Sequence, residues 1–261
     1  MNRTLSVGPR EEFVINGILP GAYTLYAMVR DQGVTYSARE NIDVGSENID
    51  GLMVRLTAGG EVAGEMIAEE REKLPSSVRV SLSPSLAGGF FLGTQQAEVK
   101  EGRFALANVQ PERYRVNVTG LPDGYFVKTV RAGDQDAMEN GFEPSVGTLL
   151  RITVSGKAGL IDGTVTDGSE KLAAGSTVAL LDADPKRRGR FEHSRIAVTD
   201  QNGVFGFMNV PPGGYKLFAW QDIEPGAWMD PDFAKAFESK AEAITLRESG
   251  RESVSLKVLE K

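Results

Sequence analysis

The sequence predicts an all-β protein made of tandem two-sheet β-sandwich modules of immunoglobulin-like type, with a short helix in the last module. Two observations lead to this prediction: a motif that recurs three times, and short alternating strands separated by turns. Glycine is also abundant, with 30 residues in a chain of 261, against an average usage of about 7%. Because no collagen-like period accounts for it, this excess indicates many turns between short strands.

The recurring motif is a phenylalanine followed by a proline seven residues later and a tyrosine ten residues later. Its copies occupy residues 13–25, 104–116 and 205–217. The phenylalanines lie 91 and 101 positions apart, a spacing that matches small β-sandwich domains of about 100 residues. Self-similarity at such a period is the signature of a repeat architecture.

The third copy shows how the motif should fold. Phe205 and Phe207 alternate with residues of other character, which is the period of a half-buried strand. The prolines and glycines of segment 211–214 then force a bend, and Tyr215 opens a second alternating strand. We expect each motif tyrosine to bury its ring and to bond its hydroxyl to nearby backbone.

Further alternating strands surround the motifs and predict the module boundaries. Strands are expected at 60–66, 77–82, 159–165, 176–181, 195–199 and 204–207, and closing strands at 52–56, 149–154 and 254–258. The Asn202–Gly203 pair between two of these strands predicts a β-hairpin. The modules then occupy residues 1–57, 58–155 and 156–261, joined with almost no linker.

The first module is expected to be the C-terminal half of a truncated sandwich. Only twelve residues precede Phe13, whereas the strands before the later motifs need many more. We therefore expect the chain to begin in the middle of a module, with a sheet edge that another segment or chain covers.

Composition excludes several classes of function. With 29 basic and 36 acidic residues the net charge is −7, and an acidic protein repels nucleic-acid phosphates. The basic run 186–190 is expected to be a solvated loop tip rather than a phosphate site. The absence of cysteine excludes disulfides, thiol catalysis and thiolate metal sites. No apolar run approaches the ~20 residues that span a bilayer, and residues 1–9 lack the apolar core of a signal peptide.

The third module resembles the carboxypeptidase regulatory-like domains, which are β-sandwiches of prealbumin-like or starch-binding-like fold. The resemblance is carried by segments 159–167, 199–205 and 209–217, and the tail 219–228 is similar to the versions in multi-repeat exported bacterial proteins. The second module matches more loosely, with Glu112 and Arg113 in place of glycines. The resemblance implies a non-catalytic spacer, fold-supporting or binding domain.

Catalytic residues are scarce. His193 is the only histidine, so a zinc site with two histidine ligands is excluded, and no Gly-x-Ser-x-Gly elbow is present. Segment 200–203 resembles part of a calcium loop but lacks the later bidentate glutamate, which favours a turn. We expect no enzymatic activity and no cofactor.

The candidate ligand site lies in the last module. Trp220 and Trp228 are the only tryptophans, and Phe233 and Phe237 share one face of a short helix that starts near Asp230. One interpretation is an aromatic platform on which sugar rings or another partner could stack. The other is that the helix caps the sandwich and the aromatic rings are buried beneath it.

These observations predict a non-catalytic structural and binding array from a secreted or cell-envelope bacterial protein. It would be located outside the cell, in the periplasm or on the cell surface. Its partners would be other domains of the same longer protein, or an envelope or extracellular partner. The alternative is a carbohydrate-binding module that uses Trp220 and Trp228.

Overall fold

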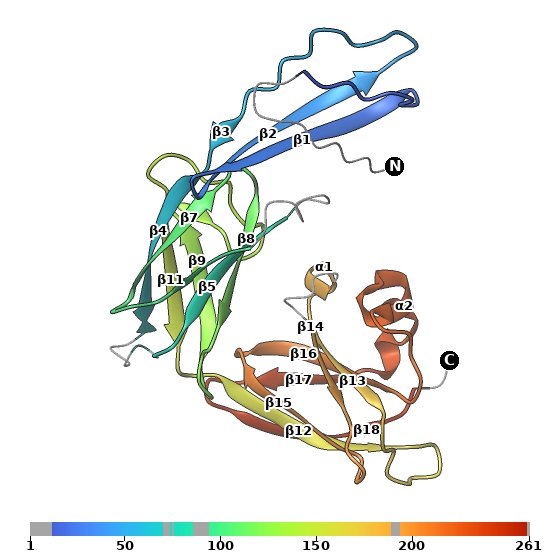
Figure 1. The fold of residues 1–261 in the computed structure, drawn as a ribbon. Coiled ribbons are helices and arrows are strands. Elements are labelled where there is room, and N and C mark those ends of the chain that lie inside the picture. The colour runs from blue at the N-terminus through green and yellow to red at the C-terminus, as the bar shows by residue number, and fades with distance from the viewer. Residues whose placement is uncertain (1–11, 70–73, 75, 86–93, 189–193, 260–261) are drawn as a thin grey trace. The chain divides into compact units, whose positions relative to one another are not determined.

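The computed structural model describes residues 12–69, 74, 76–85, 94–188 and 194–259 (Figure 1). The regular secondary structure of this part of the chain is mostly β-strand, which confirms the predicted fold class. It forms two compact units: Met1–Met66, Ser76–Thr119 and Thr129–Ile152 make unit 1, and Ile67–Pro75, Gly120–Lys128 and Thr153–Lys261 make unit 2. The predicted module boundaries after residues 57 and 155 stay predictions.

The first segment forms a three-stranded antiparallel sheet in the order β1-β2-β3. The strands are β1 (Gly21–Asp31), β2 (Val34–Val44) and β3 (Thr57–Ala58). The closing strand predicted at 52–56 is wrong: only residues 57–58 pair with β2. Alternation of apolar residues does not by itself make a strand, because the backbone also needs a partner along its length.

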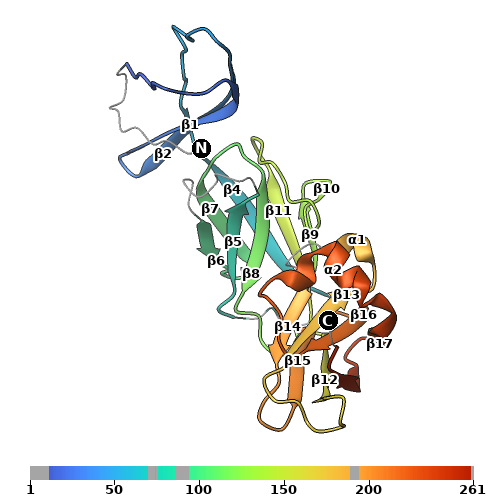
Figure 2. The same cartoon turned by 90° about the vertical axis from the view of Figure 1, so that its right-hand side faces the viewer.

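The second set of strands forms two sheets (Figure 2). One has the order β10-β9-β11-β4-β7 and the other the order β6-β5-β8. Their bounds are β4 (Gly60–Ala68), β5 (Arg79–Pro84), β6 (Gln95–Glu98), β7 (Arg103–Val109), β8 (Tyr114–Thr119), β9 (Phe126–Ala132), β10 (Gln135–Asp136) and β11 (Leu149–Ser155). Alternate residues of β4, β5, β7 and β11 are buried, as expected for strands with one face on a core.

The third set forms a sandwich of a three-stranded sheet, β15-β12-β18, and a four-stranded sheet, β14-β13-β16-β17. The strands are β12 (Gly159–Thr166), β13 (Thr177–Asp182), β14 (Ser194–Val198), β15 (Val204–Val210), β16 (Gly213–Trp220), β17 (Glu242–Leu246) and β18 (Arg251–Lys257). The helices are α1 (Pro185–Arg188), η4 (Ala227–Met229), α2 (Pro231–Ala236) and η5 (Glu238–Lys240). The first and last strands, β12 and β18, run parallel.

The two central strands of the four-stranded sheet, β13 and β16, are covered on both faces. Leu217 and Ala219 of β16 join the core between the sheets, whereas Phe218 and Trp220 lie on the opposite face in a cluster with Phe237, whose ring contacts Trp220. This accounts for the nearly continuous apolar run in β13 and β16, since a strand that is covered on both sides loses the polar half of the alternation.

The Asn202–Gly203 hairpin prediction is wrong. The turn forms, with the Asp200 carboxylate accepting from the N–H groups of Asn202 and Val204, but β14 pairs with β13 and β15 pairs with β12. The connection therefore passes from one sheet to the other. Local turn chemistry sets the bend, whereas the choice of partner strand depends on long-range packing.

A close contact between the motif phenylalanine and a glycine fixes how each motif strand packs against the first strand of its sandwich. Phe205 lies opposite Gly163 in the β12–β15 ladder, and a Cβ at Gly163 would lie 3.0 Å from the Phe205 ring and 2.0 Å from the Val254 carbonyl oxygen. Phe104 lies opposite Gly64 in the same way, and a Cβ there would lie 2.1 Å from the ring. Any side chain at these glycines would displace the aromatic ring or the neighbouring strand.

All three motif tyrosines bond the backbone four residues earlier, which confirms the predicted role of their hydroxyl groups. Tyr23 and Tyr215 donate to the carbonyl oxygens of Leu19 and Pro211, at 2.9 and 2.7 Å. The hydroxyl of the buried Tyr114 accepts from the N–H of Gln110 at 3.2 Å. Burial raises the pKa of Tyr215 to about 12 and also raises the pKa of Tyr114, so these two hydroxyls stay protonated at neutral pH.

Replacing Tyr215 with Phe should lower the free energy of unfolding of the last sandwich by about 1 kcal/mol, the net contribution of a partly buried hydrogen bond. Intrinsic fluorescence during urea unfolding measures this directly, because the only tryptophans are Trp220 and Trp228. Tyr23→Phe is the matched control and should leave the tryptophan-monitored midpoint unchanged. Equal midpoints for Tyr215→Phe and wild type would contradict the assigned role.

Candidate functional site

Trp220 is a core residue. It is the last residue of β16, is 1% exposed, and stacks on Phe218 with the ring centroids 5.5 Å apart and an interplanar angle of 2°. Phe237 approaches edge-on, with its centroid 5.7 Å away. Trp220 and Phe237 are therefore covered by the protein itself and offer no surface to a ligand in this conformation.

Helix α2 covers this aromatic cluster. It begins where the sequence predicts, with the Asp230 side chain accepting from the Asp232 N–H and Pro231 in the first turn. Phe233 and Phe237 lie on the same face, with ring centroids 5.2 Å apart. This arrangement agrees with the interpretation in which the helix caps the sandwich.

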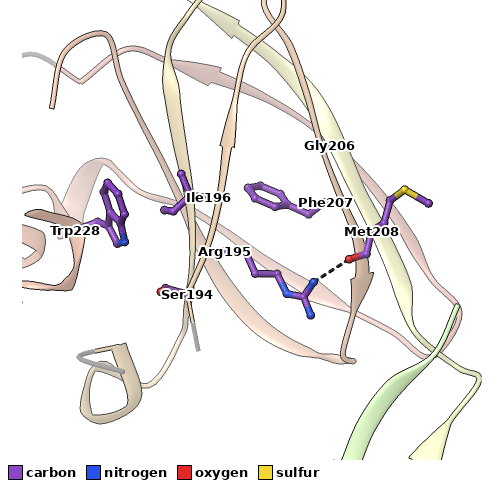
Figure 3. A pocket seen from close by; sticks show the side chains of 7 residues that line it. All are labelled: Ser194, Arg195, Ile196, Gly206, Phe207, Met208 and Trp228. Atoms are coloured by element: carbon purple, nitrogen blue, oxygen red, sulfur yellow. Dashed lines mark hydrogen bonds between the residues drawn. The ribbon is translucent and has the colours of Figure 1, made fainter. Parts of the chain in front are cut away.

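Trp228 has a different environment. It lies in η4, is partly exposed, and borders an open pocket of about 510 Å³ (Figure 3). The other residues that line the pocket are Ser194, Arg195, Ile196, Gly206, Phe207 and Met208. The indole N–H of Trp228 has no hydrogen-bond partner within the described ranges. The structure therefore separates the two tryptophans: one is in the core and the other is beside a pocket.

Arg195 is the charged residue of this pocket, and it is already bound to the backbone. Its guanidinium donates to the carbonyl oxygens of Met208 and Asn209, at 2.9 and 2.8 Å (Figure 3 shows the first). Burial lowers its pKa from the ordinary value. Arg195 consequently connects β14 to the end of β15, across the gap between the two sheets.

The basic run 186–190 was expected to be solvated, and for Arg188 this expectation is wrong. Arg188 is 5% exposed. It donates to the Asp182 and Ala183 carbonyl oxygens at 2.6 and 2.9 Å and forms an ion pair with Glu238 at 2.5 Å. Its partner Glu238 follows α2 fifty residues later in the chain, so no local pattern could have indicated the pair.

Glu238 joins two cations and attaches the segment after α2 to the sheet. It pairs with Lys216 of β16 as well as with Arg188. The hydrogen bond from Arg188 is the largest cause that lowers the pKa of Glu238, and Lys216 adds to it. These contacts are structural, because each charged group of the cluster is already paired with another.

The described residues contain no group of three or more His, Cys, Asp or Glu side chains that could hold a metal ion. His193 lies outside the described residues. Within the described ranges, no helix is long and apolar enough to cross a membrane.

No family model matches the chain, and no curated protein matches it. Solved structures with a similar arrangement are a streptococcal ancillary pilin, the Bacillus anthracis TIE protein and a putative carbohydrate binding protein from Pseudomonas aeruginosa. The pilin is 14% identical, with 94% of this chain and 77% of the pilin covered and a TM-score of 0.33. The TIE protein is 14% identical, with 91% and 43% covered and a TM-score of 0.27. The Pseudomonas protein is 20% identical, with 39% and 88% covered and a TM-score of 0.24.

These values indicate a distant likeness and identify no family. The chain spans less than half the length of the TIE protein.

Glu238→Gln should weaken the last sandwich at neutral pH and remove part of its acid sensitivity. Because the folded-state pKa of Glu238 lies below its ordinary value of 4.5, the carboxylate stabilises the fold fully above 4.5, and this stabilisation is lost as the pH falls through the folded pKa. Thermal unfolding between pH 7 and pH 3 measures the effect. The control is the same substitution at the exposed Glu242, which should leave the pH profile unchanged. Identical pH profiles for Glu238→Gln and wild type would contradict the stabilising role of Glu238.

Proposed function

We propose that the chain is a non-catalytic structural and binding array of β-sandwich modules, of carboxypeptidase regulatory-like type, from a secreted or cell-envelope bacterial protein. The modules would be residues 1–57, 58–155 and 156–261. The observation that carries this proposal is the corner built by the motif tyrosines Tyr23, Tyr114 and Tyr215, each bonded to the backbone four residues earlier.

The repeated residues support a structural role because they pack the strands together and hold the bend between them. The phenylalanine packs on a glycine of the neighbouring strand in the second and third copies, and the tyrosine holds the bend that follows. Of the residues that line the pocket beside Trp228, four lie outside the motif: Ser194, Arg195, Ile196 and Trp228. What recurs is a way of folding rather than a reaction site.

Exposed apolar side chains in the first segment support the proposal of a partner. Val14, Leu19 and Met53 are 70%, 67% and 79% exposed. Because no residue of β1 or β2 is fully buried either, this sheet lacks a covered face, and we propose that another domain of the same protein, or an envelope or extracellular partner, covers it. The proposed location is outside the cell, in the periplasm or at the cell surface.

A second candidate function is carbohydrate binding through Trp228. It is favoured by one observation, the partly exposed indole at the edge of the open pocket. Sugar rings stack on such aromatic faces, whereas the indole N–H is itself buried, so recognition would rest on the face of the ring. Trp220 would act only by supporting the cluster behind this surface.

Protease treatment of intact cells that produce the protein tests the main proposal. Peptides from the chain should be released while a cytoplasmic marker protein stays intact, or after the outer membrane alone is opened if the location is periplasmic. Release only after complete lysis would rule out the proposed location. A panel of hydrolase substrates should show no turnover by the purified chain.

A glycan array tests the second candidate. If Trp228 stacks on a sugar, Trp228→Ala should lower the affinity for any glycan that binds by at least tenfold, which is about 1.4 kcal/mol. Met53→Ala removes an exposed apolar side chain far from the pocket in sequence and should leave binding unchanged. Equal binding by both variants would remove Trp228 from any glycan site.

A further inference from the structure

Two asparagines at the same motif position have an unusual backbone conformation. Asn108 and Asn209 both follow the motif phenylalanine by four residues, and both are left-handed, with φ of 57° and 54°. The corresponding residue of the first motif is Gly17, with φ of 67°. A left-handed residue is therefore common to all three copies, and two of them carry an amide side chain there.

A β-bulge accounts for this conformation. The β4–β7 register shifts between the pairs Gly60↔Val109 and Val62↔Leu106, and the β12–β15 register shifts at the same place, between Gly159↔Val210 and Ile161↔Phe207. Each shift adds one residue to the motif strand beside the asparagine. Bulges of this kind place a residue in the left-handed region and re-aim its side chain out of the ladder.

In unit 2 the side chain of Asn209 binds a turn from earlier in the chain. Asn209 accepts from the N–H of Gly124 at 2.7 Å and donates to the carbonyl oxygen of Pro122 at 3.4 Å. The carbonyl oxygen of Gly124 in turn accepts from the N–H of Ala158 at 2.9 Å, just before β12. Gly124 is thus held through both of its backbone polar groups.

Unit 1 repeats the same set of bonds. Asn108 accepts from the N–H of Thr35 at 3.3 Å and donates to the carbonyl oxygen of Gly33 at 3.2 Å. The carbonyl oxygen of Thr35 accepts from the N–H of Gly59 at 2.9 Å, just before β4. In both units the asparagine binds a carbonyl and an N–H two residues apart.

The turns that are bound also correspond to each other. Each follows the strand that contains the previous motif's tyrosine: β1 contains Tyr23 and leads into residues 32–33, and β8 contains Tyr114 and leads into residues 120–125. We infer that Asn108 and Asn209 form a joint site, in which the bulge asparagine of one module clamps the turn after the motif strand of the module before it. This inference rests on the modular array proposed above.

The chemistry of the side chain supports a binding role. Glycine is the residue that a left-handed bulge position favours, so asparagine at this position carries a conformational cost. Its amide supplies one donor group and one acceptor group, which match the exposed carbonyl and N–H of the turn. A carboxylate has the same shape but cannot donate.

Neighbouring residues reinforce both clamps. In unit 2 the Arg195 guanidinium binds the carbonyl oxygens of Met208 and Asn209, at the bulge itself. In unit 1 Gln110 donates to the Thr35 carbonyl oxygen at 2.8 Å and accepts from the Ser37 hydroxyl at 2.7 Å. The partner that fits such a site is a backbone turn of another module, recognised with little regard to its side chains.

Amide hydrogen exchange of the full chain, read by NMR, tests the inference. Asn209→Gly keeps the left-handed backbone and removes the clamp, so protection of the Gly124 and Ala158 amides should fall at least tenfold while the β13 amide of Leu180 is unchanged. Asn209→Asp should give an intermediate loss, because its carboxylate still accepts from Gly124 but no longer donates to Pro122. Asn108→Gly should have the corresponding effect on the Thr35 and Gly59 amides.

Glu170→Gly is the matched control, since Glu170 is another left-handed residue, with φ of 62°, in a turn away from the joint. It should leave the Gly124 and Ala158 amides protected. Unchanged protection in Asn209→Gly would overturn the joint site. Because the readout is local and uses purified protein, it is independent of the cell-surface location, so the two proposals can fail separately.

Discussion

The contact between the motif phenylalanine and a glycine of the opposite strand sets the geometry on which the later features depend. Phe205 occupies the space above Gly163, and Phe104 the space above Gly64, which brings each motif strand against the first strand of its sandwich. From that pairing the chain runs into the bulge and then into the bend that the tyrosine hydroxyl holds. A side chain larger than hydrogen at either glycine would separate these strands and move everything that follows.

The bulge connects this packing to the joint. An extra residue in β7 and β15 interrupts the ladder, and the interruption leaves backbone groups that need other partners. In the third sandwich Arg195 donates to the carbonyl oxygen of Asn209, and the asparagine side chain binds a turn from earlier in the chain. The β-bulge near the end of the motif strand thereby provides the asparagine side chain that binds the earlier turn.

The connection after the motif strand differs most between the modules. It consists of residues 32–33 after β1 and residues 120–125 after β8, and each is bound by a bulge asparagine. After β16 it consists of residues 221–241 and contains η4, α2 and η5. The aromatic insertion therefore occupies the position in the sequence where the other modules have the turn that a bulge asparagine binds. Its rings cover the outer face of β13 and β16, which explains why these two strands are apolar on both faces.

The sequence alone determined the features that depend on neighbouring residues. The strand alternation, the proline-rich bend with its tyrosine and the helix start at Asp230 follow from local periodicity and turn chemistry, and all three are present. The separation of β14 from β15, the burial of Trp220 and the Arg188–Glu238 pair were decided by tertiary structure. So were the partners of Asn209, since Gly124 lies 85 residues away. These features depend on which distant segments pack together, and a local sequence motif does not indicate those long-range contacts.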